Sequence, residues 1–274
     1  MKVRIRTAAV AAALILPLSL GACSTGGDSA TPNGTNTTAA AQDSNDPFNA
    51  TAGAEVDKDA FMEQTQAAML EKGSYAMTMT MSLGGQDMKV TGVGDMTDKD
   101  NLKAKMTMEM PGSTGQGINV LLVNKTMYMQ LPGQAGGKYV EMPMEQLTQA
   151  GGGDFERLLN PAESLRMSKD AVNKITFVGE EDKDGQKLKH YQMELDLTKA
   201  NEAAGVTPAP NATGPQTVPY DVWVDNDKLM RQMEMTVEGT KVTMLLDKYG
   251  EPVDIAAPPS ASITTMPGMP QPTS

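Results

Sequence analysis

Residues 75–83 read Tyr-Ala-Met-Thr-Met-Thr-Met-Ser-Leu, and this stretch decides the fold. Large apolar residues alternate with small ones, most of them polar. Because successive side chains of a β-strand point to opposite faces of the sheet, this alternation predicts a strand with one apolar and one polar face. The Gly84-Gly85 pair that follows is typical of a hairpin turn.

The same period of two recurs along most of the chain. Further strands are expected over residues 88–96, 102–110, 118–123, 126–131, 175–181, 186–197, 220–224, 229–237 and 241–249. A helix is expected between a capping Asp57 and Gly73, and shorter helices over 143–150 and after Asn160-Pro161. We therefore predict an α+β fold. Its strongly curved antiparallel sheet would form a half-open barrel, with helices covering the concave face.

The first 22 residues are predicted to be a lipoprotein signal peptide. Three basic residues among the first six precede the apolar stretch 8–20, which is too short to span a membrane comfortably. Leu20-Gly21-Ala22-Cys23 looks like a lipobox, in which the cysteine is diacylated before cleavage. Cys23 is the only cysteine, so we expect it to anchor the protein to the outer face of the bacterial cell membrane. An ordinary signal peptide with a chance cysteine is the alternative.

Composition divides the rest of the chain. Residues 23–54 are rich in Ser, Thr, Gly, Asn, Asp and Ala, which predicts a disordered tether. Residues 55–258 are expected to form a single domain, and the Pro-rich residues 259–274 a disordered tail. The formal net charge of −11 argues against nucleic acid as a partner, because nucleic-acid binding requires a basic surface.

Methionine is unusually abundant, with 23 Met against 4 Phe, 6 Tyr and 1 Trp. Methionine is long, unbranched and polarisable, so a methionine-rich face suits a cavity that accepts flexible chains. An ordinary core that uses methionine where other proteins use leucine or valine explains the pattern equally well. The residues expected to line a cavity are Phe61 and Met69 from the first helix, with Met79, Met81, Met106, Met108, Met127, Met129 and Met193 from the strands.

Several segments of the body carry a resemblance to a known family. They are Asn160-Pro161, residues 175–180, Asp184-Gly185 followed by His190-Tyr191, residues 219–225, and residues 249–255 running into 257–259. In this order they resemble the actinobacterial lipoproteins of the LppX, LprA, LprF and LprG type, which share the half-open barrel of the LolA and LolB lipoprotein carriers. The resemblance covers about residues 57–259. It implies a pocket between sheet and helices that binds acylated glycolipids or similar amphiphiles, and it brings no catalytic motif.

The preferred interpretation is therefore a monomeric, non-enzymatic lipoprotein that carries or presents a lipid, without cofactor or metal. His190, the only histidine, is expected on the solvent face of its strand rather than in a catalytic site. One alternative is an interaction protein with a collapsed core, whose acidic surface meets a transporter or cell-wall partner. Copper binding by the methionine thioethers is another, since soft sulfur ligands suit Cu(I). An esterase or transferase acting on bound lipid is the enzymatic alternative.

Overall fold

The computed structural model describes residues 46–98, 100–109, 111, 117–133, 135–149, 159–203 and 216–264. The expected signal peptide, Cys23 and most of the expected tether lie outside these residues, as does the chain from residue 265 onward. Two compact units divide the chain, Met1–Ala41 and Gln42–Ser274. The helices and strands of the structure belong to the second unit.

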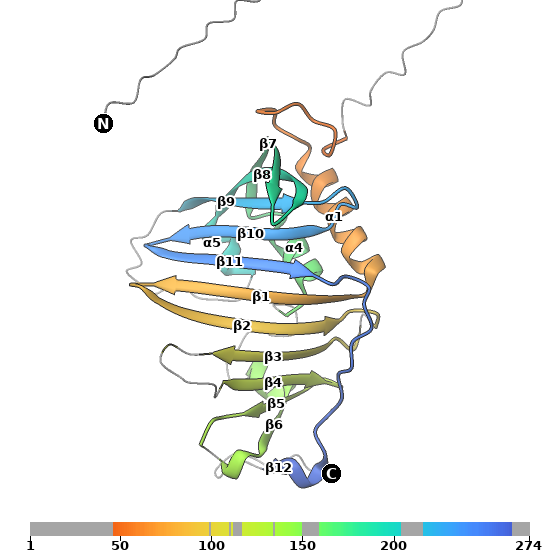
Figure 1. The fold of residues 1–274 in the computed structure, drawn as a ribbon, viewed down its shortest axis with the longest axis vertical. Coiled ribbons are helices and arrows are strands. Elements are labelled where there is room, and N and C mark those ends of the chain that lie inside the picture. The colour runs from red at the N-terminus through yellow and green to blue at the C-terminus, as the bar shows by residue number, and fades with distance from the viewer. Residues whose placement is uncertain are drawn as a thin grey trace, which may run out of the picture. The chain divides into compact units, whose positions relative to one another are not determined.

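One sheet of twelve strands dominates this unit (Figure 1). The strands are β1 (Ser74–Leu83), β2 (Gln86–Asp95), β3 (Lys103–Glu109), β4 (Ile118–Val123), β5 (Thr126–Gln130), β6 (Tyr139–Pro143), β7 (Val172–Lys183), β8 (Gln186–Asp196), β9 (Thr217–Val224), β10 (Met230–Val237), β11 (Thr240–Asp247) and β12 (Ile263–Thr264). Their order is β12-β6-β5-β4-β3-β2-β1-β11-β10-β9-β8-β7, and only the β12–β6 pair is parallel. The predicted α+β class and antiparallel sheet are thus confirmed. The sheet is open, with β7 and β12 as its edges.

Over the described residues, four helices accompany the sheet: α1 (Lys58–Lys72), α2 (Met144–Gln149), α4 (Pro161–Ser168) and α5 (Leu197–Ala203). The ends of α1 follow the predicted capping: the Asp57 carboxylate accepts from the Ala60 N–H at 2.9 Å, and Gly73 ends the helix in the left-handed conformation. Asn160 caps α4 in the same way. Short 3₁₀ turns occupy Ala135–Gly137 and Ser260–Ser262. Among the described residues, no helix is long and apolar enough to cross a membrane.

The register of the strands places the apolar residues in rows across one face. Residues directly opposite each other in neighbouring strands share a face. The first row, from β3 to β7, contains Met108, Val90, Met79, Met244, Met233, Val222, Tyr191 and Phe177. The second, from β2 to β7, contains Met88, Met81, Val242, Met235, Tyr220, Met193 and Ile175. We call this side of the sheet the apolar face.

Two glycines of β2 allow large neighbours to lie close to the apolar face. A Cβ at Gly94 would come within 2.3 Å of the Tyr75 ring, and one at Gly92 within 2.6 Å of Met106 Cγ. The Tyr75 hydroxyl in turn donates to the Leu159 carbonyl, just before α4. The absent side chains of β2 thereby create the space through which Tyr75 connects the sheet to the start of a helix.

Part of the expected tether belongs to the folded domain instead. Phe48 is only 5% exposed and lies in the hydrophobic core. The Tyr191 hydroxyl donates to the Pro47 carbonyl at 3.1 Å, and Lys189 Nζ donates to the Phe48 carbonyl at 2.7 Å. The segment before α1 also pairs with the edge strand β7, where the Gly53 N–H donates to Phe177 O and the Val56 N–H to Ile175 O. This pairing satisfies backbone groups that an edge strand would otherwise expose.

The other end of the predicted domain also extends further than expected. Ser260–Ser262 form a 3₁₀ turn, and Ile263 and Thr264 pair with Tyr139 and Val140 as β12. The predicted start of the disordered tail at residue 259 is therefore too early. Figure 1 shows the segment before β12 running past the ends of the strands between β11 and β4.

Candidate ligand-binding face

The apolar face is closed where it meets α1. Phe48 stacks on Phe61 with ring centroids 5.2 Å apart, and Tyr191 lies 4.6 Å from Phe61 and 5.2 Å from Phe177. Phe61 and Tyr191 are fully buried. We call these four rings the aromatic cluster. Rings packed edge to face and offset at such distances define one arrangement, so this end of the face is a rigid core.

On the strands from β3 to β10 the members of these two rows are only half-buried, except for the buried Val90. Seven methionines lie there, and we call them the methionine patch: Met79, Met81, Met88, Met108, Met233, Met235 and Met244. Met79 is directly opposite Met244, and Met244 is opposite Met233. Met81 is likewise opposite Met88. Cβ atoms of directly opposed residues are about 4.5–5.5 Å apart, so the patch is contiguous.

The nine residues predicted to line a cavity divide between these two regions. Met79, Met81 and Met108 belong to the methionine patch, and Met106 and Met129 are half-buried against the core. The other four are buried in the core: Phe61, Met69, Met127 and Met193. The register puts all seven predicted strand residues on the apolar face. That any of them contacts a ligand stays a prediction.

Sequence reasoning left Met88, Met233, Met235 and Met244 out of the predicted lining. The alternation that placed Met79 on an apolar face was equally visible around Met233 and Met235. What the sequence does not show is that β11 pairs with β1, which brings the last strands of the chain beside the first. Such a long-range pairing has no local sequence signal.

The described interior around the apolar face is strongly apolar. Burial raises the pKa of Tyr75 and Tyr220, and it is the main cause of the raised pKa of Tyr191, to which the charge of Asp46 adds. The two rows contain no charged side chain. Among the described residues, Thr65 on α1 has a buried hydroxyl oxygen without a hydrogen-bond partner. This environment accepts hydrocarbon and penalises charge.

The opposite face of β7, β8 and β9 carries a polar cluster around His190. Its Nδ1 lies 2.8 Å from a Glu181 oxygen, and its Nε2 lies 2.8 Å from an Asp221 oxygen. Its ring stacks on Trp223 at 4.5 Å, and the Trp223 indole N–H donates to Glu181 at 2.9 Å. The hydrogen bond from Trp223, followed by the interaction with His190, holds the pKa of Glu181 below its usual value despite the opposing effect of burial.

His190 therefore lies on the polar face, as predicted, but it is not a free surface residue. Its side chain is only 13% exposed. Its partners carry no local sequence signal, because Glu181 belongs to β7 and Asp221 to β9, on either side of His190 in β8. The cluster connects three strands.

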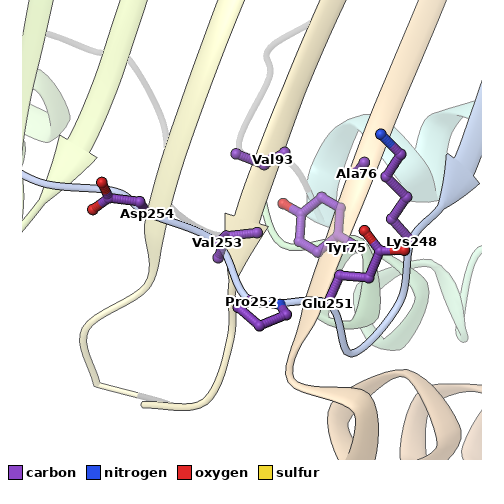
Figure 2. A pocket seen from close by; sticks show the side chains of 8 residues that line it. All are labelled: Tyr75, Ala76, Val93, Lys248, Glu251, Pro252, Val253 and Asp254. Carbon is purple, nitrogen blue, oxygen red and sulfur yellow. The ribbon is translucent and has the colours of Figure 1, made fainter.

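A separate cavity of about 250 Å³ lies where the segment after β11 passes the ends of β1 and β2 (Figure 2). Lys248, Glu251 and Asp254 make its lining partly charged. It contains none of the residues predicted to line a lipid cavity. Among the described residues, His, Cys, Asp and Glu side chains form no group of three or more that could hold a metal ion.

Two solved mycobacterial structures share this fold. LprF from Mycobacterium bovis matches with a TM-score of 0.51 at 18% sequence identity, over 73% of this chain and 96% of LprF. The Mycobacterium tuberculosis lipoprotein LppX matches with a TM-score of 0.50 at 14% identity, over 73% of this chain and 98% of LppX. The fold is thus the LolA-like fold of these proteins, as the sequence resemblance predicted.

The chain belongs to a protein family of unknown function, DUF7537, whose model matches residues 4–244. No curated protein matches the sequence significantly.

Proposed function

We propose that this protein is an extracytoplasmic lipoprotein that binds a lipid or acylated glycolipid on its apolar face without catalysing a reaction. Residues 1–22 would be its signal peptide, and a diacylated Cys23 would anchor it to the outer face of the cell membrane. Because residues 46–54 are folded, the tether would be shorter than composition suggests and would end near residue 45.

The observation that carries the proposal is the methionine patch. Seven half-buried methionines lie side by side in an otherwise apolar environment. Contiguous exposed apolar surface is uncommon on soluble monomers and often marks a binding site. Each ligand methylene removed from water there would contribute about 0.8 kcal/mol, so an acyl chain of ordinary length gains enough to bind.

Methionine suits this task better than a rigid side chain. Its three rotatable bonds let the patch adjust to chains of different length and unsaturation. We propose that the sheet curves around such a chain as a half-open barrel, with helices over its concave side. The aromatic cluster would then form the closed end, against which the ligand abuts.

The shared fold supports the extracytoplasmic location proposed for this protein. LppX is described as a lipoprotein, and a lipobox at Leu20 to Cys23 would make this chain one as well. Fold similarity at such low identity does not identify the ligand. The chemistry of the apolar face is what points to an acyl chain.

Uptake of a fluorescent fatty acid by the full chain tests the proposal, with native mass spectrometry to detect co-purified lipid. Met81→Trp and Met108→Trp should lower uptake at least severalfold, because the indole fills space over the patch. Thr80→Trp is the matched control, since Thr80 points to the opposite face of the same strand and should leave uptake unchanged. A lipid-free mass together with no uptake would support the interaction protein with a collapsed core.

The anchor has a separate test. Cys23→Ala should move the protein from the membrane fraction to the soluble fraction, because the acyl chains are attached through that thiol. Membrane attachment that survives the substitution would contradict the lipobox prediction.

A further inference from the structure

The sulfur atoms of the methionine patch have a chemistry that leucine or valine would not provide. A thioether can be oxidised to a sulfoxide, which turns a flexible apolar side chain into a polar one. Two groups of methionines in the described part of the chain differ in how far an oxidant can reach them. Met62, Met96 and Met230 are at most 4% exposed, whereas every member of the patch is half-buried and accessible in part to solutes.

We propose that the methionine patch is an oxidation site, at which oxidants of the peroxide class convert an apolar ligand-binding face into a polar one and lower its affinity for an acyl chain. The effect on ligand binding rests on the function proposed above. The selective modification of the patch does not.

The step needs no further reactant besides the peroxide. The methionine sulfur attacks one peroxide oxygen, an S–O bond forms and the O–O bond breaks, and the remaining oxygen leaves as water after taking up the displaced proton. The thioether loses two electrons and the peroxide gains them.

The arrangement of the patch makes the consequence larger than for scattered methionines. Met79, Met244 and Met233 follow one another across three adjacent strands. Their sulfoxide oxygens would be strong acceptors, yet the neighbouring Val90 and Val242 side chains offer no hydrogen-bond donor. An acyl chain that covered these oxygens would remove them from water without a partner, which disfavours binding.

The aromatic cluster should confine the structural effect of oxidation to the methionine patch. Phe61 and Tyr191 are fully buried, and they hold α1 on the sheet independently of the patch. The fold should therefore survive oxidation while the face loses its apolar character.

Treatment of the full chain with hydrogen peroxide tests both parts. Peptide mapping by mass spectrometry should find oxygen added to the patch at least severalfold faster than to Met62, Met96 and Met230. Uptake of a fluorescent fatty acid should fall severalfold after treatment, with an unchanged far-UV circular dichroism spectrum. Equal oxidation rates in the two groups, or full sulfoxidation of the patch with unchanged uptake, would overturn the proposal.

Leucine variants isolate the sulfur chemistry, with the ratio of uptake after and before peroxide as the readout. That ratio should fall much less than in the natural protein when all seven patch methionines are replaced by leucine, and should fall as in the natural protein in the control Met62→Leu/Met96→Leu/Met230→Leu. If the seven-fold variant does not fold, Met79→Leu/Met233→Leu/Met244→Leu should show a smaller fall than the control. An equal fall would overturn the proposal.

Failure of the proposed function gives a different result. If untreated protein takes up no fatty acid, the acyl-chain function and the predicted effect on it are both wrong. The peptide map then still decides whether the patch is a selective oxidation site.

Discussion

Two regions of the apolar face differ in character, although the same rows of strand residues supply Phe177 and Tyr191 to one and the methionine patch to the other. At one end Phe48, Phe61, Phe177 and Tyr191 are buried ring against ring. At the other end the methionine patch is only half covered. The difference shows that one continuous face can be a rigid core where helix α1 covers it and can stay partly open where methionines occupy it, even though Met233, Met235 and Met244 also pack against the core.

The largest expected difference between the two ends comes from truncating one side chain at each. Phe61→Ala should lower the free energy of unfolding by about 3–5 kcal/mol, because it leaves a cavity within the aromatic cluster. Met81→Ala should cost less than about 1.5 kcal/mol, since its side chain is only half-buried. Urea unfolding followed by the fluorescence of Trp223, the only tryptophan, measures both. Equal losses would mean that the patch is core as well.

Phe48 tests whether the segment before α1 completes the closed end. Phe48→Ala should lower the free energy of unfolding by about 3 kcal/mol, because the ring packs on Phe61. Substitution of Asn49, which is exposed at the same turn, by Ala serves as the control and should cost less than about 1 kcal/mol. If Phe48→Ala lowers the free energy of unfolding no more than Asn49→Ala does, residues 46–54 belong to the tether and not to the folded domain.

Buried tyrosines predict a loss of stability at high pH. Their folded-state pKa is raised above the ordinary 10.0, so the stabilisation is fully present below pH 10 and is lost as the pH rises above it. Each tyrosine contributes a slope of up to about 1.4 kcal/mol per pH unit. Tyr220→Phe should make the decline in the free energy of unfolding less steep by that amount. An unchanged slope would indicate that Tyr220 reaches solvent.

The unpartnered hydroxyl of Thr65 on α1 predicts that its removal makes the protein slightly more stable. Thr65→Val keeps the shape of the side chain and removes a buried polar atom without a hydrogen bond. The free energy of unfolding should rise by about 1 kcal/mol. A loss of stability instead would show that the hydroxyl has a partner in solution, such as a water molecule or the polar group of a ligand.

The smallest effect is expected on the polar face, where Glu181 interacts with Trp223 and His190. Its pKa is lowered from the ordinary 4.5, so its contribution is present above that pH and is lost as the pH falls through the lowered value. Glu181→Gln should cost less than about 1 kcal/mol near pH 7, because the carboxylate is 40% exposed. The difference in free energy of unfolding between Glu181→Gln and the natural protein should disappear at acidic pH, where the carboxylate is protonated. A difference that does not change with pH would mean that the charge of Glu181 does not contribute to stability.

Much of this fold was predictable because its causes are local. Alternation over residues 75–83 predicted β1, and the capping residues Asp57, Gly73 and Asn160 marked the helix ends correctly. The short strands β6 and β12 were missed, since β6 has five residues ending in Pro143 and β12 only two. Segments that short form strands because a neighbour is present, and their own residues carry little signal.

The candidate site was predictable only in part for the same reason. Alternation assigned Met79, Met81 and Met108 to the apolar face of their strands. It did not reveal that the partners of Met79 come from β11 near the other end of the chain, and it placed Phe48 outside the domain. A single aromatic residue among small polar ones has no period from which burial can be inferred.

The sequence alone therefore determined which side of each strand is apolar and where the main helices begin and end, because side-chain alternation and capping depend on neighbours within a few residues. Only the tertiary structure decided which part of the apolar face is closed by aromatic rings and which part stays half-open as the methionine patch. Burial depends on what packs against a surface, and here the packing partners are Phe48, α1 and the paired strands β1 and β11, which are distant in sequence.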